Sequence, residues 1–233
     1  MKAEIDCYKS YICSGISKSQ TRWQIIIATI VSGIVPWLIC IFMAEDNPVS
    51  FWLSIVVYTL PFVLAAYIYS FTENPSIYQL IKANIVKLVS VYITYNISIV
   101  LLLDRINANL SIILCSVIIP AVVFASAIAL KLIIIDSGKY KRSNSLGISI
   151  SGCFALGYII AQYVNDDYNV DFGDMFGYKL LSAVCFFIVV AASIKLTDIL
   201  KLHYIRRIER CGYNIEEMIL RDIREDCRKR FKK

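Results

Sequence analysis

The sequence has little of what catalytic and metal sites are built from. Its 233 residues include one histidine, His203, and none of its eight cysteines falls in a CxxC pair. A serine nucleophile needs a nearby base, commonly histidine, and a zinc site needs Cys or His ligands at short spacing. No P-loop or GxGxxG motif occurs, and no carboxylate lies near the middle of an apolar stretch. We therefore expect no catalytic residue, no cofactor and no metal.

Charged residues are also scarce, at 18% of the chain, whereas an ordinary soluble domain has about 25%. Hydrophobic residues make up 58%, and the mean hydropathy is +0.64. This composition excludes a soluble protein and an intrinsically disordered one. Apolar stretches of about 20 residues recur six times, and each can cross a hydrocarbon core about 30 Å thick. The chain is predicted to be an all-α, polytopic membrane protein.

Six transmembrane helices are expected, joined by short connections that make neighbouring helices antiparallel. They are predicted at residues 23–43, 51–71, 85–103, 110–135, 146–164 and 180–200. The chain then divides into an N-terminal segment (1–22), a transmembrane domain (23–200) and a tail (201–233). The first apolar run is longer than that of a signal peptide and no small-x-small cleavage site follows it, so we expect it to be retained.

Lysine and arginine are distributed unevenly between the two sides of this topology. The N-terminal segment, the loops near 72–84 and 136–145, the tail, and the helix ends that adjoin them at Lys87, Lys131 and Lys195 hold 22 of the 24 basic residues. Only Arg105 and Lys179 fall on the other side. Basic residues accumulate on the cytoplasmic side. Both termini should therefore be cytoplasmic in a bacterial inner (plasma) membrane. The net charge of +6 then reflects cytoplasmic loops and does not indicate direct binding of nucleic acid.

Small residues at a spacing of four mark two of the predicted spans. They are Ala121, Ala125 and Ala129 in the fourth span and Gly147, Ser151 and Ala155 in the fifth. Because apolar bulk gives no drive to associate within lipid, helices there pack over small residues that let their backbones approach. We expect both stripes to be buried against protein, either within one subunit or between the subunits of a homo-oligomer.

Polar residues inside the predicted spans are few. Asn96 lies deepest, where it could line a polar cavity or hydrogen-bond to a neighbouring helix. Lys131, Lys195 and Asp198 lie at cytoplasmic helix ends, from which long side chains can reach the interface. Three prolines, Pro36, Pro61 and Pro120, should each bend a helix, and such bends either set the helix shape or act as gating hinges.

The tail has the periodicity of an amphipathic helix. The last span is expected to continue as a helix until residues 211–213 break it, after which Asn214 can cap a second helix. An apolar stripe follows every four residues: Ile215, Ile219, Ile223, Cys227 and Phe231. The tail also carries six acids, whereas a lipid-binding helix usually has a basic polar face. The stripe therefore favours a contact with another tail or with a soluble cytoplasmic partner over one with anionic lipid.

Two hypotheses of function follow from these features. The first is a non-enzymatic, homo-oligomeric inner-membrane protein that contacts the lipid bilayer and recruits a cytoplasmic protein. The second is a small transporter or channel, with a pore built by Asn96, the proline-bent helices and the acidic outer loops. A transporter should have more charge at mid-membrane than this chain carries, whereas a scaffold needs none.

In its length, span layout and charged tail, and in a composition rich in Ile, Ser, Tyr, Lys and Asn, the chain resembles membrane subunits of bacterial antiphage systems. It most resembles the membrane subunit of Kiwa-type defence. This resemblance implies an envelope sensor that assembles as an oligomer and binds a soluble DNA-binding partner on the cytoplasmic side. Colicin immunity proteins are similar in composition, but they are typically smaller and lack such a tail.

The topology can be checked by cysteine labelling. Single cysteines introduced at Asn47, Asn107 and Asn169 should react with a membrane-impermeant reagent from outside the cell, because all three positions lie in predicted outer loops. Protection of any two of them would contradict the arrangement with both termini cytoplasmic.

Overall fold

All elements in the described part of the chain are α-helices. The computed structural model describes residues 2–14, 20–43, 48–138, 140 and 174–218. Its helices are α1 (Lys2–Cys13), α2 (Arg22–Val31), α3 (Ile34–Met43), α4 (Pro48–Tyr69), α5 (Ile77–Arg105), α6 (Leu110–Asp136), α8 (Asp174–Leu196) and α9 (Ile199–Arg210). For these residues the predicted all-α class is confirmed.

Five helical segments are long and apolar enough to cross a membrane. They are Arg22–Ile41, Pro48–Tyr69, Ile77–Arg105, Leu110–Asp136 and Gly177–Arg210. Each corresponds to one of the six predicted spans, and their length and composition support a membrane protein. The remaining predicted span, 146–164, lies outside the described residues, so the count of six stays a prediction.

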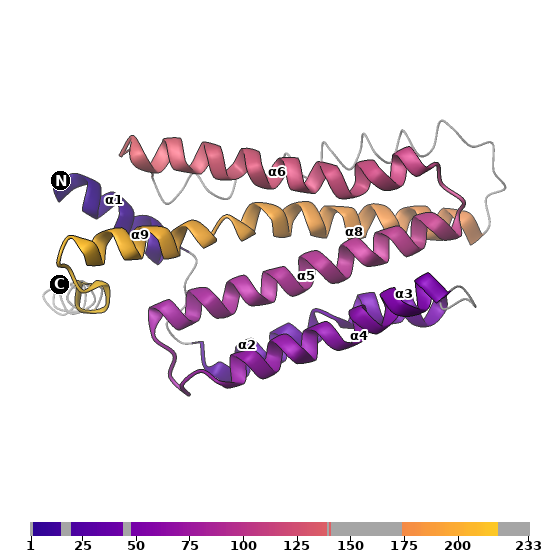
Figure 1. The fold of residues 1–233 in the computed structure, drawn as a ribbon, viewed down its shortest axis with the longest axis horizontal. Coiled ribbons are helices and arrows are strands. Elements are labelled where there is room, and N and C mark those ends of the chain that lie inside the picture. The colour runs from indigo at the N-terminus through magenta and orange to yellow at the C-terminus, as the bar shows by residue number, and fades with distance from the viewer. Residues whose placement is uncertain (1, 15–19, 44–47, 139, 141–173, 219–233) are drawn as a thin grey trace, which may run out of the picture.

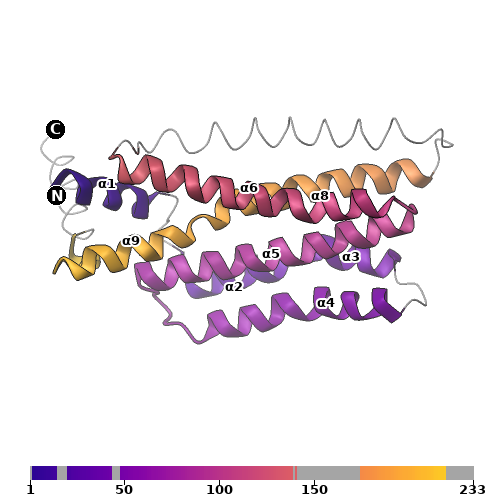
Figure 2. The same cartoon turned by 45° about the horizontal axis from the view of Figure 1, so that its top comes forward.

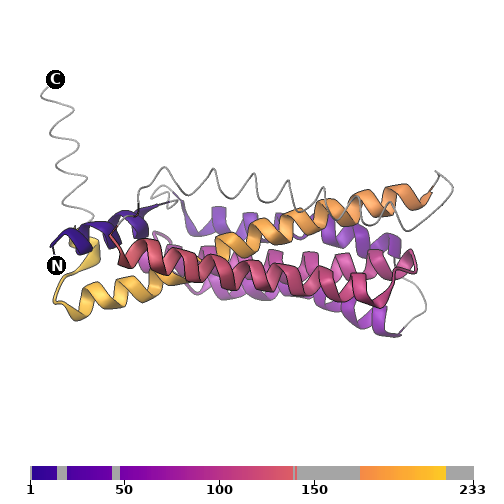
Figure 3. The ribbon, with the colours of Figure 1, turned by 90° about the horizontal axis from the view of Figure 1, so that it is seen from above.

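The helices form an elongated bundle with α5 at its centre. On one side α5 packs along α8, which in turn packs against α6, and on the other side it packs against α2, α3 and α4 (Figures 1 and 2). The seam between α5 and α8 is the main part of the core; it includes Tyr95, Ile99, Leu102, Cys185, Val189 and Val190. At one end of the bundle, α1 and α9 lie beside the end of α6 (Figure 3).

The first predicted span is two helices, not one. The helix is interrupted by a turn at Ser32 and Gly33, between α2 and α3. Pro36 then falls in the first turn of α3, where its missing N–H removes no intrahelical hydrogen bond. In one continuous helix the N–H of residue 36 would bond the carbonyl of Ser32, so the break lies where Pro36 is expected to interrupt the helix.

The proline of α4 is accommodated by a side chain of α3. Pro61 lacks the N–H that would bond the carbonyl of Val57 one turn earlier. The indole Nε1 of Trp37 donates a hydrogen bond to that carbonyl at 3.0 Å. Trp37 also stacks on Phe62, with ring centroids 5.3 Å apart. Pro61 is thus held in a fixed contact between helices, which supports the interpretation that this proline sets shape.

The last predicted span is also interrupted. A turn at Thr197 and Asp198 separates α8 from α9, before the predicted end of the span at residue 200. The expected break at residues 211–213 is confirmed, and Gly212 there has a φ of +81°, which glycine adopts without strain. Asn214 accepts hydrogen bonds from the backbone N–H groups of Glu216 and Glu217, at 3.0 and 3.5 Å, as predicted for a cap.

Replacing Gly33 with alanine should destabilise the protein. The added Cβ would lie 2.9 Å from ring carbons of Trp37 and 3.0 Å from Cγ of Pro61. The proline ring is rigid, and Trp37 can retreat only by losing its bond to Val57 and its stacking. We expect the free energy of unfolding, measured by denaturant titration in detergent, to fall by about 1–3 kcal/mol.

Gly177→Ala is the matched control. A Cβ at Gly177 in α8 would meet no atom within 4 Å. Because alanine favours helix over glycine by about 1 kcal/mol, this variant should be at least as stable as the original protein. An unchanged stability of Gly33→Ala would contradict the close approach of these helices.

Candidate functional site

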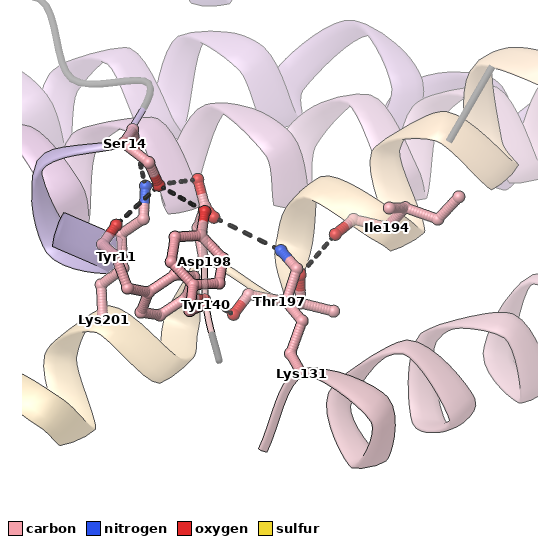
Figure 4. A network of polar contacts seen from close by, with 8 residues as sticks. All are labelled: Tyr11, Ser14, Lys131, Tyr140, Ile194, Thr197, Asp198 and Lys201. Atoms are coloured by element: carbon pink, nitrogen blue, oxygen red, sulfur yellow. Dashed lines mark hydrogen bonds and ion pairs between the residues drawn. The ribbon is translucent and has the colours of Figure 1, made fainter. Parts of the chain in front are cut away.

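A cluster of charged side chains lies where α1, α6, α8 and α9 meet. Lys131 comes from α6, Asp198 from the turn between α8 and α9, and Lys201 from the first turn of α9 (Figure 4). Tyr11 and Ser14 reach the same place from α1 and the residue that follows it. We call these five residues the charged cluster.

The turn between α8 and α9 positions the carboxylate of the cluster. The hydroxyl of Thr197 donates to the carbonyl of Ile194 at 2.5 Å. The carbonyl of Thr197 accepts a hydrogen bond from the hydroxyl of Tyr11 at 3.1 Å. These bonds satisfy backbone groups that the helix end would otherwise leave unpaired. The turn therefore depends on α1, which supplies one of its partners.

Asp198 lies between the two lysines. Its Oδ2 is 3.1 Å from Nζ of Lys201, and its Oδ1 is 3.8 Å from Nζ of Lys131. The side chain of Lys201 is only 3% exposed, against 22% for Lys131 and 27% for Asp198. Lys201 also donates to the carbonyl of Ser14 at 2.5 Å, and Lys131 donates to the hydroxyl of Thr197. Each ammonium is thus compensated by a carboxylate and a neutral oxygen.

Tyr11 covers the cluster with its ring. The ring centroid lies 5.7 Å from Nζ of Lys131 and 5.7 Å from Nζ of Lys201, within the range of cation–π attraction. Burial raises the pKa of the Tyr11 hydroxyl, and the negative charge of Asp198 raises it further. The hydroxyl therefore stays protonated and remains a donor to Thr197.

This arrangement is suited to holding helices together. Two ammonium groups share one carboxylate, so removing that carboxylate would leave two like charges in a largely buried place. The polar atoms of the cluster are directed at one another, across four helices (Figure 4). The charged cluster consequently makes the position of α1 depend on the relative positions of α6 and α8.

Aromatic side chains extend the contact between α1 and α9. Tyr8 stacks on Tyr204 with centroids 4.7 Å apart, and Tyr11 meets Tyr204 edge to face at 5.9 Å. The hydroxyl of Tyr204 donates to Oδ1 of Asp136 at 3.1 Å, and Arg207 pairs with the same oxygen at 3.3 Å. Together, α1, α9 and the adjoining ends of α5 and α6 bury one apolar cluster, which we call the head.

Only one residue of the predicted partner-binding stripe is described. Ile215 is 3% exposed and packs inside the head. Ile219, Ile223, Cys227 and Phe231 lie outside the described residues. Binding of a partner by this stripe stays a prediction, and its first residue is already engaged by the chain itself.

The predicted stripe of the fourth span lies on the surface of the described bundle. Ala121, Ala125 and Ala129 are exposed on α6, where no described residue covers them. Gly147, Ser151 and Ala155 of the fifth span lie outside the described residues. The packing of the two stripes stays a prediction.

Helix α5 carries a stripe of small buried residues that the sequence analysis did not predict. Ser90, Thr94 and Ser98 are buried on α5 at a spacing of four. Thr94 and Ser98 donate to carbonyls of their own helix at 2.8 and 2.9 Å. The amide nitrogen of Asn96 donates to the carbonyl of Tyr92 in the same helix at 2.7 Å, so this bond does not join α5 to a neighbouring helix.

Sequence reasoning missed the charged cluster, although two of its residues were noticed. From the sequence, Lys131 and Asp198 are predicted to reach the interface separately, from the ends of their own helices, and Lys201 is one of many basic residues in the tail. The available signal was the spacing of three between Asp198 and Lys201, which places both on one helical face. Nothing local indicated that Lys131 or α1 would join them.

No protein-family model matches the chain, and no curated protein or solved structure matches it either.

Asp198→Asn should loosen the head from the bundle. Loss of the carboxylate leaves Lys131 and Lys201 unpaired, so we expect the free energy of unfolding to fall by about 3 kcal/mol. Cys7 of α1 is buried against the carbonyl of Ile135 and serves as a native probe. Its labelling by a thiol reagent, followed by peptide mass spectrometry, should accelerate when α1 detaches.

Asp136→Asn makes the same chemical change at an exposed ion pair. Asp136 and its partner Arg207 have side chains that are 50% and 51% exposed. Such pairs contribute less than about 1 kcal/mol, so stability and Cys7 labelling should change little. Equal effects of the two substitutions would contradict the role assigned to the charged cluster.

Proposed function

We propose that the protein is a non-enzymatic, homo-oligomeric protein of the bacterial inner membrane that recruits a soluble cytoplasmic partner. In this proposal it has six spans, and both termini and the head lie in the cytoplasm. One observation carries it: the head is tied to two membrane-spanning helices through the charged cluster. The head could thereby report a change within the bilayer to a partner bound outside it.

The distribution of charge supports a head outside the bilayer. Uncharged runs cover residues 88–103 of α5, 110–130 of α6 and 180–194 of α8, and towards the head they stop at Lys87, Lys131 and Lys195. The segment Gly177–Arg210 has 34 residues. At 1.5 Å per residue it spans about 50 Å, more than a hydrocarbon core of about 30 Å can contain. In this proposal most of α9 projects from the membrane.

Signal transfer follows from where the ion pairs are anchored. Lys131 belongs to α6, whereas Asp198 follows α8 directly, so any tilt between α6 and α8 changes their separation. Lys201 of α9 pairs with the same carboxylate, and Tyr11 of α1 interacts with it electrostatically. A small displacement of α6 or α8 inside the bilayer would thus alter the packing of α1 within the head.

The exposed face of α6 supports assembly into a homo-oligomer. The alanine stripe Ala121, Ala125 and Ala129 lies beside exposed Val122, and such small residues let a second helix approach closely. A second copy of the chain, contacting this face directly or through the stripe of the fifth span, would bury it.

A sensor of this design agrees with what the resemblance to Kiwa-type defence subunits implies. That resemblance adds an expected context, defence against phage, and an expected partner, a soluble protein on the cytoplasmic side. The head and the tail that follows it provide a surface for such a partner.

A second candidate is a small transporter or channel, and one observation favours it. Oγ of Ser90 and Oδ1 of Asn96 are buried on α5 without a hydrogen-bond partner among the described residues. Unpaired polar atoms in a span can mark a path for a solute. The hydroxyls of Thr94 and Ser98 weigh against it, because they donate to carbonyls of their own helix and need no solute as a hydrogen-bond acceptor.

Removing residues 219–233 should abolish recruitment. This deletion takes away Ile219, Ile223, Cys227 and Phe231 but leaves Ile215 in the head, so the membrane domain should insert and keep its oligomeric mass. Affinity purification in mild detergent with mass determination measures the oligomer and the co-purifying protein together. Ile219→Asp with Ile223→Asp should reproduce the loss, with binding weakened by about tenfold or more.

The matched control is Arg221→Gln with Arg224→Gln, which changes the net charge of the tail by the same amount but spares the apolar stripe. It should retain the partner. An unchanged set of co-purifying proteins after the deletion would contradict recruitment by the tail and leave the transporter or channel ahead.

A further inference from the structure

A basic groove runs along the surface of α9. It has a volume of about 620 Å³, and the described residues that line it all lie on one face of α9: Ile199, Leu202, His203, Arg206, Arg207 and Arg210. The two apolar residues lie near the start of α9, and the three arginines lie towards its end. The groove therefore changes from apolar to strongly basic along its length.

The arginines of the groove differ in how far they are already engaged. Arg207 pairs with Asp136 at 3.3 Å, and its guanidinium lies 5.2 Å from the centroid of the Tyr8 ring. Arg206 interacts with the hydroxyl of Tyr78 from α5, but like Arg210 it is exposed. Arg206 and Arg210 are four residues apart, so they share one face of the helix. A guanidinium offers five donors in a fixed fork, which matches the oxygens of a phosphate. Arg206 and Arg210 are thus positioned to grip one phosphate group together.

The apolar end of the groove lies next to the charged cluster. Ile199 directly follows Asp198 and is 46% exposed, although it is a large apolar residue. Lys131, which pairs with Asp198, marks the point where the uncharged run of α6 ends. The groove consequently begins where the apolar part of the bundle stops and leads away from it.

We propose that this groove binds an anionic phospholipid, with its phosphate on Arg206 and Arg210 and an acyl chain along Ile199 and Leu202. A phospholipid has the same order of polarity as the groove, apolar towards the membrane core and anionic beyond it. An acidic protein segment or a free phosphate would satisfy the arginines but would leave the apolar end uncovered. The site rests on the proposed placement of the head outside the bilayer.

The occupied groove would give the head a second attachment to the membrane. Arg207, beside the two phosphate-binding arginines, holds Asp136 and Tyr8. Lipid bound at Arg206 and Arg210 would therefore lie next to the contact between α9 and α1. In this way the lipid composition of the inner leaflet would influence how firmly α1 is docked.

The test measures lipid binding by the full-length protein. The purified protein in nonionic detergent is titrated with phosphatidylglycerol or phosphatidylcholine, and bound lipid is counted by native mass spectrometry. We expect phosphatidylglycerol to bind about tenfold more tightly than phosphatidylcholine. Arg206→Gln with Arg210→Gln should weaken phosphatidylglycerol binding by about tenfold or more, because each basic residue near the headgroups contributes measurably to binding.

The control is Arg105→Gln with Lys179→Gln, which removes the same charge from the ends of α5 and α8 that lie away from the head. It should leave phosphatidylglycerol binding within about twofold. Thermal unfolding of each variant without added lipid checks that the substitutions leave the fold intact. An equal loss in both double variants would overturn the assignment of the lipid to this groove.

Ile199→Ser separates a lipid from a free phosphate. It should weaken phosphatidylglycerol binding severalfold, and inorganic phosphate should not compete with the lipid at comparable concentration. Competition by inorganic phosphate together with no effect of Ile199→Ser would overturn the proposal, as would equal binding of both lipids or no binding at all. Co-purification of the cytoplasmic partner is measured on the same variants. It tests partner recruitment, whereas the lipid titrations test the groove, so failure of one proposal is distinguished from failure of the other.

Discussion

The structure depends on one carboxylate shared by two lysines. The carboxylate of Asp198 lies 3.1 Å from Nζ of Lys201 and 3.8 Å from Nζ of Lys131. The side chain of Lys201 is almost fully buried there. Ammonium groups are costly to bury without compensation, so the helices that carry them must stay close to the carboxylate. This requirement brings α6, the turn after α8, and α9 to one point. The ring of Tyr11 then closes the cluster from α1, and the head is built on that contact.

The charged cluster and the contact at Pro61 share one feature: a backbone carbonyl at a helix irregularity receives its hydrogen bond from another helix. Where Pro61 leaves the carbonyl of Val57 without its helical donor, Trp37 supplies an indole N–H. Where the chain turns between α8 and α9, Tyr11 supplies a hydroxyl to the carbonyl of Thr197. In each case a helix irregularity is stabilised by an aromatic side chain from another helix. Because the partner is distant in the sequence, each irregularity also fixes how two helices pack.

The proposed functions use different surfaces of the molecule. Partner recruitment is assigned to the tail beyond the head, oligomer formation to the exposed stripe of α6, and lipid binding to the basic groove of α9. The charged cluster lies between them, because it joins a span that carries the stripe to the helix that carries the groove. A scaffold that responds to the membrane needs such a connection, whereas a passive anchor does not.

The sequence by itself determined the features that depend on one helix at a time. Composition and run length identified the apolar helices, and local chemistry identified the break at Gly212 and the cap at Asn214. Only the tertiary structure decided that Lys201 is buried, since its oxygen partner in Ser14 lies 187 residues away. Periodicity reports which face of a helix is apolar. It cannot report which charges another helix will bring to that face.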